Sequence, residues 1–261
     1  MIERINIEKL NMKYCDYIQV YLPDDYYKSL EKYDVIYMHD GHNLFDIKTS
    51  AYGMIWGIDK ILGKRQKKYI IVGIECPNME RFNLYSPWKY SFDNENINDL
   101  FLNYGGKGDN YLNWIITKIM PMMNQKYRIN KANTYMAGSS MGGLITLYGG
   151  LKYPMIFKSI GVFSPAIWFA KKELLNYLKQ QVNSESLIYM DIGHKETSNQ
   201  LVIDFSSIYL NDAREVHSML EKCNIRQMHY YEDKKGNHNE LDWGRRFHCF
   251  LDFIEENQYH K

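Results

Sequence analysis

The stretch Thr134-Tyr135-Met136-Ala137-Gly138-Ser139-Ser140-Met141-Gly142-Gly143 decides the fold of this chain. An apolar run leads into the glycines, and the following run, Leu144-Ile145-Thr146-Leu147-Tyr148, is typical of a helix. Strand, G-x-S-x-G, helix is the setting in which a serine becomes a nucleophile. The glycines remove Cβ atoms that would clash in so tight a turn. The pattern therefore predicts that Ser140 projects from the turn and that the Met141 N–H, which lies at a helix N-terminus, is free to stabilise an oxyanion.

The same pattern also fits an ordinary strand-to-helix turn whose serine only caps the helix. The rest of the chain has to decide between the two interpretations.

Apolar runs that predict strands alternate along the chain with amphipathic stretches that predict helices. This alternation indicates a mainly parallel sheet with helices on both faces, and thus an α/β protein of the α/β-hydrolase fold, with functional groups at the carboxyl ends of the strands. The strands are expected at 17–22, 35–39, 69–74, 134–137, 159–163, 187–192 and 227–231, and the helices at 54–62, 111–123, 144–148, 171–180, 208–222 and 241–255.

A single domain over residues 1–261 is expected from the length and from the absence of an internal repeat or low-complexity linker. The long segment 75–107 carries seven aromatic residues. Long segments of this kind in compact domains are usually functional, so we expect it to border the active site. The alternative is a surface excursion packed by its own aromatic side chains.

Composition excludes several classes of protein. The formal net charge is +1, which argues against nucleic acid or an anionic membrane as the main partner. The N-terminus lacks the apolar segment of a secretory signal, and no apolar run approaches the roughly 20 residues of a membrane span, so a cytoplasmic location is expected. The four cysteines are scattered and suggest neither a zinc site nor a disulfide framework.

A serine nucleophile needs a base, and histidine suits this role near neutral pH. His238 fits best because it follows the last strand, in an expected turn at 235–238, and precedes the closing helix. His194 also lies at a strand end and is the main rival, whereas His217, His229 and His248 fall in regular elements.

The acid that orients the base should follow the preceding strand, where Glu196 lies. Asp191 is the alternative, although it lies within the strand, and Asp233 is a weaker one. The order Ser140, Glu196, His238 is the order of nucleophile, acid and base in α/β-hydrolases.

The second oxyanion donor is expected after an early strand, in the block Asp40-Gly41-His42-Asn43. Gly41 lets the backbone approach a substrate, and the His42 N–H is the candidate donor. A plain turn built on Asp40-Gly41 is the alternative. An oxyanion donor of this kind contributes about 2.7–4 kcal/mol in the transition state.

On these residues the chain resembles the putative esterase family of α/β-hydrolases, which includes enterochelin esterases, feruloyl and acetyl-xylan esterases and S-formylglutathione hydrolases. The resemblance covers most of the chain and implies Ser140 as nucleophile, His238 as base and Glu196 at the Gly-x-x-Asp/Glu acid position. It implies no metal or organic cofactor. His42 is a departure, since many relatives carry Gln there. The motifs are Tyr21-Leu22-Pro23, residues 37–46, Arg81, Tyr85-Ser86-Pro87-Trp88, residues 105–108, Tyr127-Arg128, residues 138–143, residues 163–168 and Gly236-Asn237-His238.

The expected activity is hydrolysis of a carboxylic ester of a small molecule or carbohydrate. Trp168 should border the cleft, and Asp40 and Arg81 are candidate substrate-binding residues, although Arg81 could instead hold its loop through backbone carbonyls. The other tryptophans, at 56, 88, 114 and 243, are expected to pack. A thioesterase, a siderophore or acyl-sugar ester hydrolase, an acyltransferase and a non-catalytic binding member are the alternatives. The sequence does not predict the oligomeric state.

Overall fold

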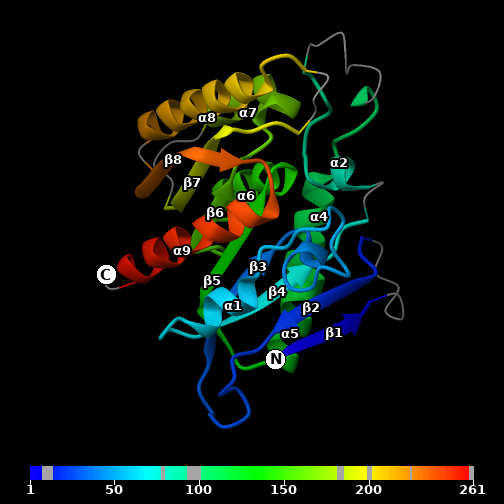
Figure 1. Ribbon diagram of the computed structural model, residues 1–261, viewed down its shortest axis with the longest axis vertical. Helices are drawn as coiled ribbons and strands as arrows, with labels where there is room; N and C mark the ends of the chain where they lie inside the picture. Colours follow the sequence, from blue (N-terminus) through cyan, green and yellow to red (C-terminus); the bar gives the residue numbers. More distant parts are fainter. Residues whose placement is uncertain are drawn as a thin grey trace.

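An eight-stranded sheet forms the centre of the protein in the order β1-β2-β4-β3-β5-β6-β7-β8 (Figure 1). The structure is a computed structural model, and it describes residues 1–7, 14–77, 80–92, 101–180, 185–198, 202–223 and 225–258. The strands are β1 (Ile2–Asn6), β2 (Tyr17–Tyr21), β3 (Tyr33–Met38), β4 (Tyr69–Ile74), β5 (Ile129–Ser139), β6 (Ser159–Phe163), β7 (Leu187–Lys195) and β8 (Gln227–Asn237).

The sheet is parallel from β4 through β3, β5, β6 and β7 to β8, whereas β1 and β2 are antiparallel additions at one side. All six residues of β4 are buried, which is typical of a strand covered on both faces. Successive side chains of β4 alternate between two hydrophobic clusters, with Ile70 and Val72 in one and Tyr69 and Ile71 in the other.

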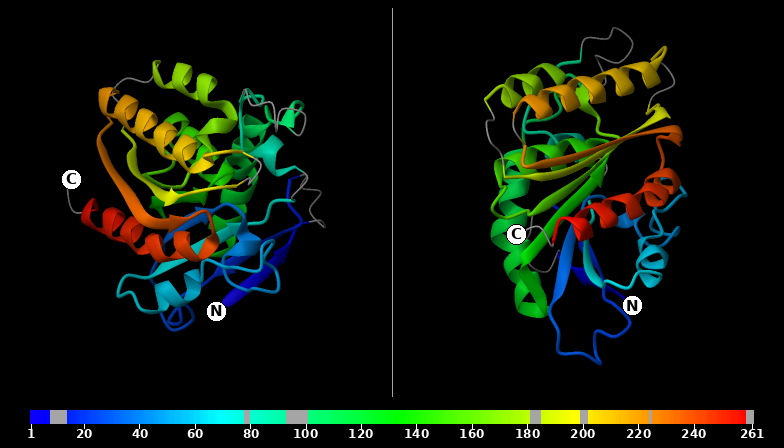
Figure 2. Two further views of the ribbon diagram at one scale, coloured as in Figure 1. Left: turned by 45° about the horizontal axis from the view of Figure 1, so that its top comes forward. Right: turned by 90° about the vertical axis from the view of Figure 1, so that its left-hand side faces the viewer.

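Helices cover both faces of the sheet, as the right-hand view of Figure 2 shows. Side chains of α4, α5, α6, α7 and α8 contribute to one hydrophobic cluster, and those of α1 and α9 contribute to the other. The predicted α/β-hydrolase fold is thereby confirmed. The α-helices are α1 (Ile58–Gly63), α2 (Arg81–Leu84), α4 (Gly108–Trp114), α5 (Met120–Lys126), α6 (Met141–Lys152), α7 (Lys171–Leu178), α8 (Phe205–Lys222) and α9 (Glu240–Glu256). The shorter helices are η2 (Gly41–Asn43), the π-helical turn η3 (Ile115–Ile119) and η4 (Ile167–Ala170).

Several predictions of local structure were incomplete or wrong, most clearly in three places. The helix expected at 54–62 begins only at Ile58, because Gly57 has a φ of 66° and cannot continue a right-handed helix. The turn expected at 235–238 is mostly strand, since β8 pairs with β7 as far as Asn237. The strand β1 was not predicted.

The segment 75–107 contains the short helix α2 and a bridge between Lys89 and Gly105. Residues 78–79 and 93–100 of this segment lie outside the described residues. In the part of the chain that the structure describes, we find no helix with the length and apolar character needed to cross a bilayer.

Candidate active site

Ser140 is the single residue between β5 and α6, and its backbone is strained, with φ 57° and ψ −122°. Its N–H donates to the Phe163 carbonyl at 3.0 Å, and its own carbonyl accepts from the Ala166 N–H at 2.9 Å. The turn requires glycine at 138, because a Cβ there would lie 2.7 Å from the Gly142 carbonyl oxygen. Backbone contacts thus hold the serine hydroxyl at the carboxyl end of the sheet.

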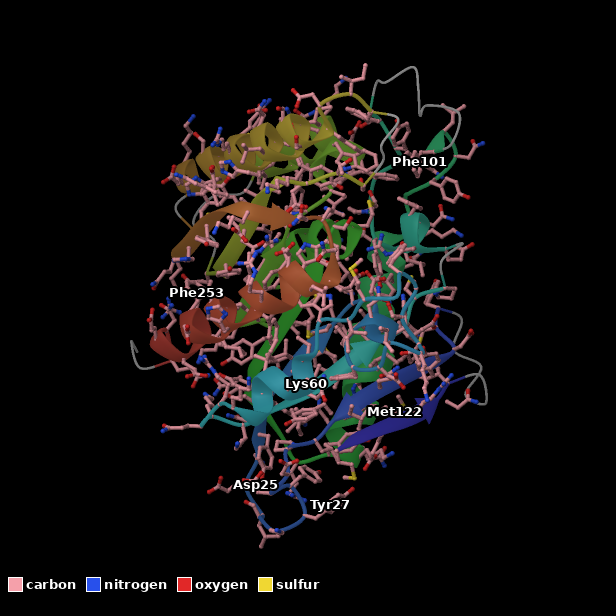
Figure 3. All side chains as sticks on the ribbon, in the orientation of Figure 1. Asp25, Tyr27, Lys60, Phe101, Met122 and Phe253 are labelled. Carbon is pink, nitrogen blue, oxygen red and sulfur yellow. The ribbon has the colours of Figure 1, made fainter. Side chains whose placement is uncertain are left out.

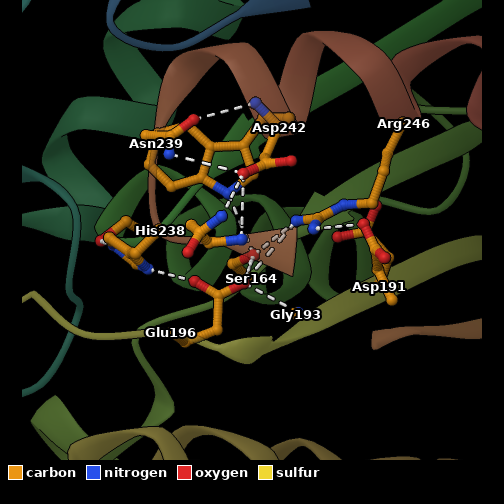
Figure 4. Close-up of polar contacts among 12 residues, drawn as sticks. Ser164, Asp191, Gly193, Glu196, His238, Asn239, Asp242 and Arg246 are labelled. Carbon is orange, nitrogen blue, oxygen red and sulfur yellow. Dashed lines mark hydrogen bonds and ion pairs between the residues drawn. The ribbon is translucent and has the colours of Figure 1, made fainter. Parts of the chain in front are cut away.

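His238 lies between β8 and α9, and its ring joins the serine to an acid. Its Nε2 is 3.0 Å from Ser140 Oγ, and its Nδ1 is 2.6 Å from Glu196 Oε2. Figure 4 shows His238 and Glu196 facing each other. An ionised carboxylate only accepts hydrogen bonds, so the proton belongs on Nδ1, and Nε2 is left to accept from the serine hydroxyl. Glu196 is fully buried, and Ser140 is 8% exposed.

The rival residues have other partners. His194 Nε2 is 2.9 Å from Glu232 Oε2. Asp191 accepts from the Tyr189 hydroxyl at 2.9 Å and lies 3.1 Å from Arg246 Nε. The structure therefore brings Glu196, rather than Asp191, to the imidazole of His238.

The two candidate oxyanion donors are placed differently. Met141 is the first residue of α6 and lines the cavity beside Ser140. His42 is buried in η2, and its neighbours Asp40 and Asn43 line the cavity. Burial lowers the pKa of His42, although the charge of Asp40 opposes this shift.

A cavity of about 320 Å³ opens above Ser140 and His238. Trp168 lines it, and the segment 75–107 contributes Arg81, Phe82 and Phe101 to its wall. Phe101 lies above α2 in the view of Figure 3. The remaining lining residues are Asp40, Asn43, Tyr52, Met54, Ser139, Met141, Thr197, Ser198, Glu240 and Trp243.

Within the part of the chain that the structure describes, Arg81 forms a two-pronged ion pair with Asp40. The distances are 2.9 Å from Nε to Oδ1 and 2.7 Å from the terminal nitrogen to Oδ2. Burial by itself would raise the pKa of Asp40, but the guanidinium of Arg81 more than offsets this effect and lowers it. Among the described residues the guanidinium is thus bound by a carboxylate, whose geometry matches its fork, and not by the backbone carbonyls considered from sequence.

Glu240 is a cavity residue that the sequence analysis missed. Its side chain is almost fully buried, and its Oε1 accepts from Asn43 Nδ2 at 3.1 Å. Burial, with a contribution from the nearby charge of Asp40, raises the pKa of Glu240 to about 7. Its position two residues after His238 was the only available signal.

Trp243 was predicted to pack, and it does so against Trp56, with ring centroids 5.9 Å apart. It also lines the cavity and contacts the ring of His238 edge-on. Among the described residues, no cluster of three or more His, Cys, Asp or Glu side chains is arranged to hold a metal ion.

Fold and site together define this protein as a hydrolase of the α/β-hydrolase fold. Comparison with known proteins makes the assignment more particular: a sequence model described as Putative esterase matches residues 11–252, and the chain belongs to that family. It is 30% identical over 213 residues to the uncharacterized protein YjcH of Bacillus subtilis, with 78% of this chain and 77% of that protein covered.

Two of the solved structures that share the fold are described as a serine hydrolase and an esterase. An IroE-like serine hydrolase from Shewanella oneidensis superposes with a TM-score of 0.73 at 20% identity, covering 97% of this chain and 80% of the other. The enterobactin esterase FES from Shigella flexneri, in the presence of enterobactin, gives a TM-score of 0.72 at 16% identity, covering 98% of this chain and 59% of the other.

Proposed function

We propose that this protein hydrolyses a carboxylic ester through an acyl-enzyme on Ser140, with His238 as general base and Glu196 as the acid of the triad. One observation carries the proposal: two consecutive hydrogen-bond contacts, of 3.0 Å and 2.6 Å, connect the serine hydroxyl through the imidazole to a buried carboxylate. Hydrogen-bond reach between nucleophile, base and orienting group is the signature of this chemistry.

In the first half-reaction, Ser140 Oγ attacks the acyl carbon while its proton passes to His238 Nε2. The carbonyl oxygen becomes an oxyanion, for which the Met141 and His42 N–H groups are the proposed donors. His238 then gives its proton to the leaving alcohol as the C–O bond breaks, and the acyl group stays on Ser140. Glu196 holds the Nδ1–H of His238 and stabilises the imidazolium that forms between these steps.

In the second half-reaction, water takes the place of the alcohol. His238 removes a proton from water as its oxygen attacks the acyl-enzyme, and then returns a proton to Ser140 Oγ as the acid leaves. The cavity is continuous with the groups involved, since Ser140, Met141 and His238 all line it.

The walls of the cavity suggest how a substrate is held. Phe82, Phe101 and Trp168 offer an aromatic side, whereas Asp40 and Glu240 offer a polar one. We propose that the aromatic side takes the apolar part of the ester. Arg81 acts on the substrate only together with Asp40, because its charge is already paired with that carboxylate. An ester with an aromatic group and polar hydroxyl groups fits the aromatic and polar sides of the cavity. The likeness to the enterobactin esterase supports including siderophore-type esters among the candidates.

A substrate screen with one variant tests the proposal. We expect the purified protein to hydrolyse p-nitrophenyl acetate, and a panel of feruloyl, triscatecholate and thioester substrates should identify the preferred acyl group. Ser140→Ala should abolish hydrolysis of every active substrate and leave the circular dichroism spectrum unchanged. Undiminished hydrolysis by a folded Ser140→Ala protein would remove this serine from the mechanism.

A further inference from the structure

Ser164 lies directly after β6, where its hydroxyl uses its complete hydrogen-bonding capacity. It donates to Glu196 Oε1 at 2.6 Å, and it accepts from Trp243 Nε1 at 3.0 Å and from a terminal nitrogen of Arg246 at 2.8 Å. A hydroxyl has one proton to donate and two lone pairs to accept with. Because Trp243 and Arg246 occupy both lone pairs, the only orientation left for the proton is toward Glu196.

Glu196 is consequently held at one oxygen and free to act at the other. Oε1 accepts from the Ser164 hydroxyl and from the Gly193 N–H at 2.7 Å, with a terminal nitrogen of Arg246 at 3.7 Å. Oε2 faces His238 Nδ1 at 2.6 Å. Figure 4 shows Ser164, Gly193 and Arg246 gathered around this carboxylate. Rotation of the carboxyl group would break contacts at both oxygens.

Arg246 supplies the positive charge for this buried region. It is 1% exposed and also lies 3.1 Å from Asp191 Oδ2 and 3.5 Å from Asp233 Oδ2. The Arg246 guanidinium thus lies among three buried carboxylates, those of Glu196, Asp191 and Asp233, and its positive charge offsets part of the cost of burying them. Among the described residues, the charged and titratable groups near Glu196 include His238, Arg246, Asp191 and Tyr209.

The backbone of Ser164 is a second sign of a specialised position. Its φ is 41°, in the left-handed region that non-glycine residues rarely adopt. Glycine would adopt this backbone conformation with less strain. The strained serine therefore indicates that its hydroxyl has a specific role.

We propose that Ser164 and Arg246 are positioning residues for ester hydrolysis: they hold the Glu196 carboxyl group with Oε2 directed at His238, and act on Ser140 only through that pair. This inference rests on the proposed triad, and it assigns to the Ser164 hydroxyl a role in turnover and not in substrate binding.

Ser164→Ala and Ser164→Gly test the proposal, and the glycine variant guards against loss of folding because it suits the left-handed backbone. The matched control is Ser159→Ala, which removes another buried serine hydroxyl, at the opposite end of the same strand, where it donates to the Leu187 carbonyl at 3.0 Å. We expect both Ser164 variants to lower kcat by about 10- to 100-fold, by analogy with the loss found when the hydrogen-bond partners that orient metal ligands are removed. KM should stay within about twofold, because the cavity walls are unchanged.

Two further readouts separate positioning from a purely structural role. The inactivation rate by a fluorophosphonate, which reports the reactivity of Ser140, should fall in parallel with kcat. The far-downfield proton NMR resonance of the hydrogen between His238 Nδ1 and Glu196 Oε2 should shift or broaden in the Ser164 variants and remain in Ser159→Ala.

Folded Ser164 variants with wild-type kcat and an unmoved resonance would overturn the inference, as would a kcat loss equal to that of Ser159→Ala. Failure of the proposed function looks different, since the wild-type protein itself would then show neither fluorophosphonate inactivation nor the resonance.

Discussion

Glu240→Gln should stabilise the protein in a manner that depends on pH. Glu240 is 3% exposed, and burial raises its pKa to about 7, whereas an ordinary glutamate in the unfolded chain has a value of 4.5. Below the lower value the carboxyl group is neutral in both states and contributes no pH dependence. Between the two values the unfolded chain releases a proton that the folded protein retains, so the free energy of unfolding falls as the pH rises. Above the higher value the carboxyl group is ionised in both states, and the free energy of unfolding falls no further with pH.

The size of this effect follows from the same two values. The gap between about 7 and 4.5, at about 1.4 kcal/mol per pH unit, corresponds to about 3 kcal/mol as an upper limit. Glutamine removes the titration and can still accept the hydrogen bond that Asn43 Nδ2 makes at 3.1 Å. The variant should therefore gain about 2–3 kcal/mol over the wild type at about pH 8 and much less at about pH 5.

Urea unfolding followed by circular dichroism at both pH values measures this difference. Glu256→Gln is the matched control, because Glu256 is an exposed acid at the other end of α9. The control should give nearly the same free energy of unfolding as the wild type at both pH values. A Glu240→Gln stabilisation that is equal at the two pH values, or a destabilisation at the higher one, would refute the reasoning.

Two other substitutions probe the frame of the site. Arg81→Ala leaves the buried Asp40 carboxylate without its ion-pair partner and should lower the free energy of unfolding in urea by about 3–5 kcal/mol. Adding Asp40→Asn should recover much of this lost stability. A double variant no more stable than Arg81→Ala alone would contradict the reasoning. Gly138→Ala places a Cβ 2.7 Å from the Gly142 carbonyl oxygen and should displace the turn that carries Ser140, lowering kcat/KM for p-nitrophenyl acetate by about 100-fold or more. The control is Gly63→Ala, where the added Cβ meets no atom within 4 Å, and equal activity of the two alanine variants would count against the steric argument.

The central part of the fold could be predicted because its signals are local. The strands β4 and β6 have the predicted bounds, since each is an apolar run closed by residues that leave the sheet. The strand β1 escaped prediction because its five residues alternate between exposed and half-buried positions. It lies at the edge of the sheet and pairs with β2. The end of β8 has the sequence Glu232-Asp233-Lys234-Lys235, which is polar enough to suggest a turn, and only its pairing with β7 makes it a strand.

The site shows the same division. The meeting of Ser140, Glu196 and His238 could be predicted because parallel strands bring their carboxyl ends to one edge of the sheet. The contacts around them could not, since they join residues distant in sequence. Ser164 and Arg246 are 82 positions apart, and Arg81 and Asp40 are 41 apart. Neither pair belongs to a recognisable sequence motif. The Ser164–Arg246 contact requires α9 to pack on the sheet, and the Asp40–Arg81 contact requires α2 to do so.

Covalent labelling tests the central claim, that the imidazole of His238 activates the hydroxyl of Ser140, most directly. The protein is treated with a fluorophosphonate, digested, and mapped by mass spectrometry. The account predicts one modified peptide carrying the adduct on Ser140, with labelling abolished in Ser140→Ala and strongly slowed in His238→Ala. An adduct on another residue, or no adduct on a protein that hydrolyses esters, would contradict it.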